Sequence, residues 1–355
     1  MSLESPTKKQ KMDGPTIGTH NGHFHADEAL AVSMLRLLPT YSSSPLIRTR
    51  DPALLESCHT VVDVGGKYDP ANNLFDHHQR EFVITFPGHN TRLSSAGLVY
   101  MNFGKAIIKQ VTGLSDGEDV DVLYEKLYTE FIEAFDANDN GVSVYPSKAL
   151  AESGLTKSFE DRGFSIASVV NRFNYPYPRT SSEGKSKEQL QSEEDARFAN
   201  ASSFVGQQFL LELNDKAVSW LPARKTVAEA YSHRLKWDPK GRIMVLSEGM
   251  PWADHLYSFE KANPIPEGVE PHVLYVLFPE TKDVDSKWRI RSVSKENGGF
   301  ENRKDMPNAW KGLRDEELSR VAGIPGCVFV HASGFIGGNL TFEGCLEMAK
   351  KSCEA

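Results

Sequence analysis

The sequence predicts an α/β protein of two domains, with a largely parallel sheet in the first domain and a smaller α/β domain after it. Short apolar runs alternate with helical stretches from Thr16 onward, and this alternation is typical of a parallel sheet. A polar segment rich in proline, serine and charge interrupts the pattern before strands return in the last third. The expected divisions are a disordered tail (1–15), a first domain (16–173), a linker (174–195) and a second domain (196–350).

The elements of both domains follow from the spacing of apolar residues. The first strand is expected at 16–20, and a helix at 26–38, where apolar side chains recur at helical spacing until Pro39. The other elements of the first domain are strands at 46–49, 60–64 and 73–75 and helices at 94–111 and 119–137. In the second domain they are helices at 194–213 and 227–235 and strands at 243–246, 273–278, 288–293 and 328–331.

Composition and charge exclude several classes of protein. No run approaches the roughly 18 apolar residues that a membrane helix needs, so neither a membrane protein nor a membrane partner is expected. The four cysteines lie far apart without a CxxC pair, which indicates reduced thiols rather than a disulfide framework. The net charge of −8 excludes a duplex binder that works by total charge, so a nucleic-acid substrate needs a local basic groove.

The N-terminal residues bear on location in the cell. They lack the apolar core of a secretory signal, and without arginine they form no clear mitochondrial presequence. The segment SPTKKQK resembles a short nuclear-import signal, although a solvated tail is the simpler explanation. The expected location is intracellular, in the nucleus and cytoplasm, with the mitochondrion as an alternative.

Histidines concentrate in the first domain, where seven of the eleven lie in the first ninety residues. The densest cluster, THNGHFHADE, follows a strand and opens a helix, so it projects from the edge of a parallel sheet at which ligands bind. Imidazoles and carboxylates this close favour a divalent metal. A single histidine beside acids at a helix start would be incidental. This cluster holds four candidate residues: His20, His23, His25 and Asp27.

Three later segments carry the same residue types at the ends of elements. Asp63 ends an apolar strand before two glycines, and the triplet Asp-His-His at 76–78 follows another strand. Asp136 and Asp139 are three residues apart at a helix end, so both can share one face, although an ordinary helix stop explains them as well. Each segment alone is weak evidence, but chance does not explain their conjunction in one domain.

These residues suffice for two divalent ions, with Asp63 central enough in the series to bridge them. Oxygen-rich coordination with one or two imidazoles suits Mn²⁺ or Mg²⁺ better than zinc. Two ions about 3.5–4 Å apart activate a water and clamp the attacking and leaving oxygens of a phosphoryl displacement. The residues therefore predict phosphoester hydrolysis.

The motifs THNGHFHADEA, VVDVGG, FDHHQREF and DANDNG resemble, in the same order, those of the DHH (Asp-His-His) phosphoesterase superfamily, which includes RecJ-like exonucleases and manganese pyrophosphatases. The chain is similar to the eukaryotic melanocyte-proliferating-gene (Myg) branch over residues 16–350, and FVHASGFIGGN is part of that likeness. The resemblance implies a DHH phosphoesterase domain with two Mn²⁺ or Mg²⁺ ions and a C-terminal substrate-binding domain. It also implies 3′–5′ exonuclease activity on single-stranded RNA.

The resemblance assigns roles in the first domain. Asp63 is the bridging carboxylate, Asp76 orients His77, and His78 faces the scissile phosphate. The implied catalytic residues are Asp63, Asp76 and His78. The implied metal ligands are His20, His25, Asp27, Asp63, His77 and Asp136.

Two positions stay open in this assignment. The ligand of the fourth motif is Asp136 or Asp139, and we expect Asp136. His23 lies in the first motif without a matching ligand role, so a substrate or structural contact is expected of it.

The second domain is expected to hold the substrate. The segment Gly337-Gly338-Asn339 resembles a glycine-rich turn that the superfamily presents to phosphates, where backbone N–H groups approach an anion closely. Arg289 and Arg291 share one face of a predicted strand and give a basic surface suited to a single strand, although a solvated strand face explains them equally well. The implied substrate-binding residues are His78, Arg289, Arg291, His331, Gly337, Gly338 and Asn339.

Other functions compete with the nuclease. One is a small-molecule phosphohydrolase acting on pyrophosphate or short oligonucleotides, and another is a non-catalytic, metal-stabilised binding protein. A barrel of the amidohydrolase type could use His23-Phe24-His25 as a metal pair, but the sequence lacks an eightfold βα rhythm. The sequence leaves a homodimer open.

Overall fold

The computed structural model describes residues 14–156, 158–178, 181–263, 272–296 and 299–355. It divides into unit 1, up to Ala217, and unit 2, Val218–Ala355. The predicted tail lies, apart from residues 14 and 15, outside the described residues. The division falls after the predicted linker, because residues from Lys187 onward form a helix, α8 (Lys187–Asp215), that belongs to unit 1.

The sheet of unit 1 is largely parallel, with the strand order β2-β1-β3-β5-β4. Only β4 runs antiparallel, and it lies at the edge beside β5. The strands are β1 (Ile17–Thr19), β2 (Leu46–Arg48), β3 (Thr60–Val62), β4 (Tyr68–Asp69) and β5 (Leu74–Phe75).

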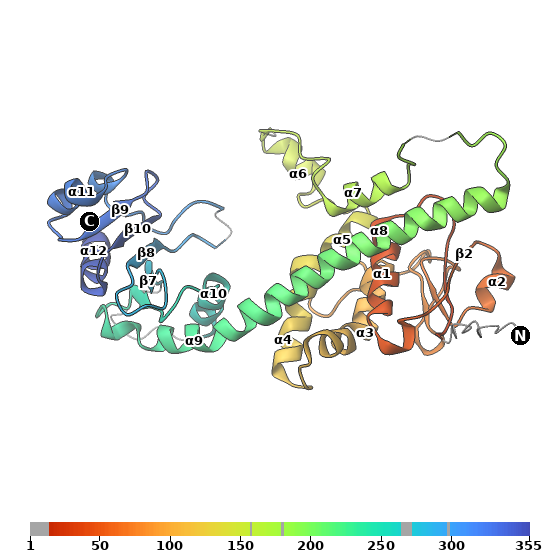
Figure 1. The fold of residues 1–355 in the computed structure, drawn as a ribbon, viewed down its shortest axis with the longest axis horizontal. Coiled ribbons are helices and arrows are strands. Elements are labelled where there is room, and N and C mark those ends of the chain that lie inside the picture. The colour runs from red at the N-terminus through yellow and green to blue at the C-terminus, as the bar shows by residue number, and fades with distance from the viewer. Residues whose placement is uncertain (1–13, 157, 179–180, 264–271, 297–298) are drawn as a thin grey trace, which may run out of the picture. The chain divides into compact units, whose positions relative to one another are not determined.

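The first two crossovers of unit 1 run in opposite directions along the sheet. Helix α1 (Ala26–Arg36) leads from β1 to β2, and α2 (Pro52–Glu56) leads from β2 back past β1 to β3. Because parallel crossovers are right-handed, the two helices lie on opposite sides of the sheet, as Figure 1 shows. The order therefore reverses between β1 and β3, and ligands of open α/β sheets bind at the carboxyl ends of the strands at such a reversal.

Helix α1 packs against α8, which passes across it (Figure 1). The buried residues of α8 recur at helical spacing, and Ser202 Oγ donates a hydrogen bond to Ala29 O at 2.8 Å. The predicted helix over 119–137 is continuous but contains a π-helical turn at Tyr128–Ile132. The other helices of unit 1 are α3 (Ser95–Thr112), α4 (Glu118–Leu127), α5 (Glu133–Asp139), α6 (Ser147–Glu152) and α7 (Ile166–Phe173).

Unit 2 has a mixed five-stranded sheet in the order β6-β7-β8-β10-β9, in which only β6 and β7 pair in parallel. One face packs on α11 and α12, and the β6–β7 part of the other face packs on α9 and α10. The strands are β6 (Ile243–Val245), β7 (Tyr275–Pro279), β8 (Trp288–Ser292), β9 (Cys327–Val330) and β10 (Ile336–Asn339). The helices are α9 (Leu221–Ser232), α10 (Ala253–Ala262), α11 (Asp315–Ala322) and α12 (Phe342–Glu354).

The structure confirms an α/β protein with two sheets, the first of them largely parallel. The four cysteines are free, as expected. Among the described residues, no helix combines the length and apolar character that a membrane span requires.

Candidate metal centre

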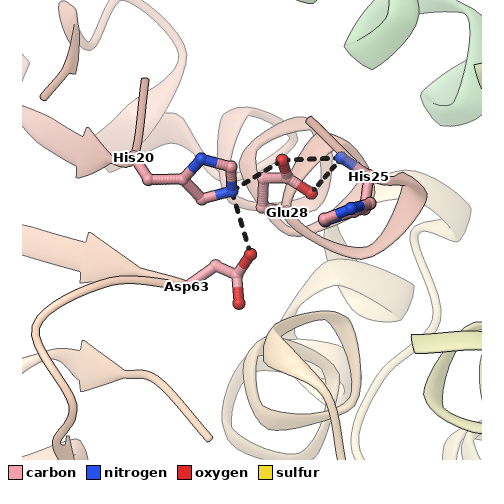
Figure 2. A group of neighbouring side chains, drawn as sticks. All are labelled: His20, His25, Glu28 and Asp63. Carbon is pink, nitrogen blue, oxygen red and sulfur yellow. Dashed lines mark hydrogen bonds and ion pairs between the residues drawn. The ribbon is translucent and has the colours of Figure 1, made fainter. Parts of the chain in front are cut away.

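Three adjacent strands of unit 1 each end in a residue of the predicted site. His20 follows β1, Asp63 follows β3 and Asp76 follows β5. His20 Nε2 lies 3.1 Å from Glu28 Oε1 and 3.3 Å from Asp63 Oδ2, so its ring lies between two buried carboxylates (Figure 2). The centre thus forms at the reversal of strand order between β1 and β3.

Asp63 has a backbone conformation that is uncommon for a residue other than glycine. Its φ is 54°, in the left-handed region, where a residue other than glycine costs about 1–3 kcal/mol. Ser95 Oγ donates to its Oδ1 at 3.1 Å and fixes the carboxylate from α3. The turn places this carboxylate within 3.5 Å of His77 Nε2 as well as beside His20. The strained residue is therefore the one shared by both histidines.

The two histidines of the Asp-His-His triplet have different carboxylate partners. Asp76 accepts hydrogen bonds from Gly66 N at 2.5 Å and His78 N at 3.0 Å, and its Oδ1 lies 2.8 Å from His78 Nδ1. The structure thus corrects the expectation that Asp76 orients His77, because its side-chain partner is His78. His77 Nε2 instead lies 3.0 Å from Asp139 Oδ2.

The predicted fourth-motif ligand, Asp136, does not reach this centre. Asp136 is fully buried and accepts hydrogen bonds from Ser94, Gly97 and Tyr128, which occupy both of its oxygens. Asp139, one turn later, lies against His77. The structure therefore brings Asp139, and not Asp136, to the other candidate ligands.

The first turn of α1 contributes two carboxylates, one of which sequence reasoning missed. Glu28 accepts from the backbone N of His25 at 2.8 and 3.0 Å and also lies beside His20. The only sequence signal for Glu28 was its position three residues after the N-cap His25, and a capping box explains that position without a metal. Asp27 is 1% exposed, and among the described residues neither of its oxygens has a hydrogen-bond partner. A buried carboxylate without donors requires a cation or a proton.

Carboxylates outnumber imidazoles in this cluster, and the excess of negative charge raises the pKa values of several of its groups. Burial lowers the pKa of His20, but Asp63 and Glu28 outweigh it and raise the pKa to about 10. The pKa of His77 is likewise raised to about 10, where Asp139 and Asp63 overcome burial. Burial and the charges of Asp63 and Asp139 hold the pKa of Asp27 well above its usual range. Protons on these groups thus offset the negative charge that a bound metal ion would otherwise neutralise.

The donor atoms fit divalent metal ions. Three groups could each hold an ion, because their ligand atoms lie within 4.8 Å of one another: His20, His25, Glu28 and Asp63; Asp63, Asp76, His77 and His78; and His25, Asp27 and Asp139. Asp63 belongs to two of these groups and His25 to two. His77 Nε2 and Asp139 Oδ2, 3.0 Å apart, form an ion pair when the ring is protonated, and both atoms are of the kinds that coordinate a divalent ion.

A hollow of about 320 Å³ opens onto the centre. Its lining includes Asp63 and Asp76 and the exposed side chains of His25, Arg50 and His78. Of the two arginines at the end of β2, only Arg50 is exposed. Arg48 is buried and pairs with Glu194 at 2.9 Å. His23 is not part of the lining, and its Nε2 lies 2.9 Å from Asn171 Oδ1.

Some of the predicted substrate residues of unit 2 are exposed, and others are buried or paired within the sheet. Gly337 and Gly338 do not form a turn, because β10 lies between β8 and β9 and pairs with both. Asn339 is fully buried, donates to Pro325 O at 2.9 Å and accepts from Thr341 N at 3.0 Å. Its side chain therefore stabilises the entry to α12 and is closed to substrate. His331 and Arg291 are exposed, and Arg289 is partly buried.

Unit 1 therefore defines a class of protein: an α/β protein whose sheet edge carries a cluster of histidines and acids that could hold metal ions. Residues 16–353 match the family model MYG1_exonuc, described as "Uncharacterised protein family (UPF0160)". The chain is 43% identical to the human protein named MYG1 exonuclease, over 97% of this chain and 87% of that protein. It is 45% identical to a MYG1 protein of Schizosaccharomyces pombe, over 95% of this chain and 97% of that protein. The chain belongs to the MYG1 exonuclease family.

Proposed function

We propose that this protein is a metal-dependent exonuclease that removes nucleotides in the 3′–5′ direction from single-stranded RNA. The observation that carries the proposal is the buried Asp27 carboxylate, without donors, within a cluster of histidines and acids beside an open hollow. Relatives that are more than 40% identical over nearly the whole chain are named exonucleases, which supports the reaction class.

Two divalent ions, Mn²⁺ or Mg²⁺, are part of the proposal. Asp63 joins two of the ligand groups, which supports a bridging role. When bound, such ions supply Lewis-acid stabilisation of the charge that develops on a phosphoryl group. The residues that would hold them are His20, His25, Asp27, Glu28, Asp63, His77 and Asp139.

The chain's own residues act on the phosphate from the hollow. Asp76 holds His78 through Nδ1 and raises its pKa, so the imidazole is biased toward the protonated form. An imidazolium that lines the hollow can donate a hydrogen bond to a phosphoryl oxygen through Nε2. Arg50, exposed on the same lining, adds a second donor with a fixed positive charge. In this proposal both residues bind and orient the anion, and His78, although it lies in one of the ligand groups, contacts the phosphate instead of an ion.

Unit 2 is proposed to bind the nucleotide chain. Arg289 and Arg291 lie on one face of β8, and their guanidinium groups lie 5.0 Å from the Phe329 ring and 5.6 Å from the Phe335 ring. Arginine next to aromatic rings is the composition of surfaces that bind single strands. An intracellular location in the nucleus, cytoplasm or mitochondrion belongs to the same proposal, and a homodimer stays a prediction.

The test is parallel incubation of the purified protein and Mn²⁺ with end-labelled single-stranded RNA, single-stranded DNA and pyrophosphate. Stepwise shortening of RNA from the 3′ end is expected, and Asp63→Ala should abolish it. His23→Ala is the matched control, because His23 hydrogen-bonds to Asn171 and belongs to none of the ligand groups, while its ring lies 5.6 Å from that of His25. If pyrophosphate is the only substrate hydrolysed, the protein is a small-molecule phosphohydrolase and not a nuclease. Metal binding without turnover of any substrate would indicate a binding protein.

A further inference from the structure

Unit 2 contains a second hollow, of about 250 Å³, that the proposed chemistry does not use. It lies where the turn before α9, the start of α10 and strand β8 meet. Its lining is rich in aromatic side chains, which include Trp220, Trp252 and Tyr257. The volume is below the roughly 300–1,000 Å³ of sites for drug-sized ligands, so it suits a single ring system.

The aromatic walls of this hollow are held in place. Trp220 stacks on His255 with ring centroids 4.5 Å apart, and His255 Nε2 lies 2.8 Å from Trp220 O. Tyr257 donates a hydrogen bond to Ser294 O at 3.0 Å. Trp252 is part of the core between the sheet and α10. The walls are thus preformed, which lowers the entropic cost of binding a flat ligand.

The charges on the lining identify the kind of ligand. Aromatic cages also bind quaternary ammonium groups, but such a cation would meet the Arg291 guanidinium here. An aromatic ring that carries an anion satisfies both the aromatic walls and Arg291. A nucleotide has both of these features.

Arg291 also connects the hollow to the open part of the sheet. Its guanidinium lies 5.6 Å from the Phe335 ring, and on the same face Arg289 and Arg314 lie 5.0 and 5.7 Å from the Phe329 ring. Arginine and aromatic side chains therefore alternate from the hollow across β8 and β9. A nucleic-acid strand bound along this strip would end with a base at the hollow.

We propose that the hollow lined by Trp220, Trp252, Tyr257 and Arg291 is a base-binding pocket that holds one nucleotide of the single-stranded substrate. The proposal rests on the proposed function and adds a second anchoring point for the strand. In this proposal Trp220 and Arg291 bind the substrate but do not take part in hydrolysis.

The experiment measures RNA binding without hydrolysis. The full-length protein is kept in EDTA and titrated into fluorescein-labelled oligoadenylate of about 12 nucleotides, near the upper site size of a single-strand binder. Trp220→Ala removes a stacking wall, and Ala253→Leu fills the hollow without removing a side chain. Each should weaken binding about tenfold, the loss expected for one stacked base. Arg291→Ala should weaken binding and also flatten its salt dependence.

Two controls match these changes. Phe300→Ala removes a fully exposed aromatic ring and Arg320→Ala an exposed arginine on α11, both away from the hollow, and neither should alter affinity. In a second readout, AMP should compete with the oligonucleotide on the parent but not on Ala253→Leu, whereas ribose 5-phosphate should not compete. Circular dichroism confirms that each variant is folded.

The outcomes separate this inference from the proposed function. Parent-like affinity in both folded Trp220→Ala and Ala253→Leu would overturn the pocket, even if the parent shortens RNA in Mn²⁺. Competition by a trimethyllysine peptide instead of AMP would also overturn it and indicate an ammonium cage. A parent that neither binds nor shortens any single strand would overturn the proposed function itself.

Discussion

The carboxylate of Asp136 fills the space that a side chain on Gly97 would need, since a Cβ there would lie 2.4 Å from both carboxylate oxygens. Asp136 Oδ1 accepts from Ser94 N at 2.8 Å, Ser94 Oγ at 2.7 Å and Gly97 N at 3.1 Å. Ser94 is the N-cap of α3, so Asp136 satisfies the first N–H groups of that helix from α5. This link between α3 and α5 fixes where Asp139 meets the metal centre.

Gly97→Ala is therefore expected to destabilise the fold by about 2–3 kcal/mol, because overpacking and lost hydrogen bonds outweigh the roughly 1 kcal/mol that alanine adds to a helix. Urea unfolding measures the change. Gly249→Ala is the matched control, because its Cβ would meet the Phe278 ring at an ordinary 3.6 Å. Equal unfolding free energies for Gly97→Ala and the parent would show that Asp136 has room to move.

Asp139→Asn is expected to lower Mn²⁺ affinity by at least about tenfold, because Asp139 faces His77 and shares a ligand group with Asp27. Asp136→Asn should lower the unfolding midpoint, since it disturbs the cap of α3, yet leave the Mn²⁺ affinity of the folded protein within about threefold. Calorimetric titration of the metal-free proteins compares the two. The opposite ranking would restore Asp136 as the ligand.

Mn²⁺ affinity is expected to rise with pH. In the metal-free protein the neighbouring carboxylates raise the pKa of His20 and His77 to about 10, so both rings are protonated at neutral pH and must lose a proton to coordinate an ion. The affinity should rise by up to about tenfold per pH unit for each displaced proton. Titrations in buffers of different ionisation enthalpy count these protons, and a flat profile would contradict the assignment.

The same two histidines give the metal-free fold a pH dependence of the opposite sign. Their raised pKa values contribute stability that is complete below the usual histidine pKa of about 6.5 and is lost as the pH rises toward 10. The unfolding free energy of the metal-free protein should therefore fall over this interval. His77→Ala should reduce the fall.

The sequence predicted the fold class and most of the centre because both follow from local patterns. Residues just after parallel strands must meet at one sheet edge, and this places His20, Asp63 and Asp76 on neighbouring strands. The choice between Asp136 and Asp139 was not predictable in this way. The π-helical turn at Tyr128–Ile132 changes the rotation of the residues that follow, and no local signal marked it.

Other differences come from long-range packing. The polar composition of residues 174–195 predicted a linker, yet its second half lies in α8, where only one stripe of side chains is buried and the rest face solvent. Gly337 and Gly338 resembled a turn, but pairing with two distant strands makes them part of a central strand. These positions are therefore glycine for a reason other than the predicted backbone contact with an anion.

Gly338 leaves room for the side chain of Arg289. A Cβ at position 338 would lie 2.9 Å from Arg289 Nη1 and 2.8 Å from Trp288 O. The guanidinium lies over the Phe329 ring, and its Nη2 donates to Glu280 at 2.6 Å. Among the described residues its Nη1 is buried without a hydrogen-bond partner, so the guanidinium is held by Glu280 and the Phe329 ring alone.

Gly338→Ala is therefore expected to displace Arg289 and to weaken binding of single-stranded RNA as much as Arg289→Ala does. The double variant should be no weaker than either single one, because both changes remove the same interaction. Gly337→Ala is the contrasting variant: its Cβ would meet Phe329 O at 2.8 Å, much as a Cβ at 338 would meet Trp288 O, but its other neighbours are Val330 and Met306 in the core, so it should lower stability without changing affinity. Anisotropy titrations in EDTA, repeated at several salt concentrations, measure affinity and its salt slope. Additive losses from Gly338→Ala and Arg289→Ala would mean that the glycine serves the substrate separately, through the backbone.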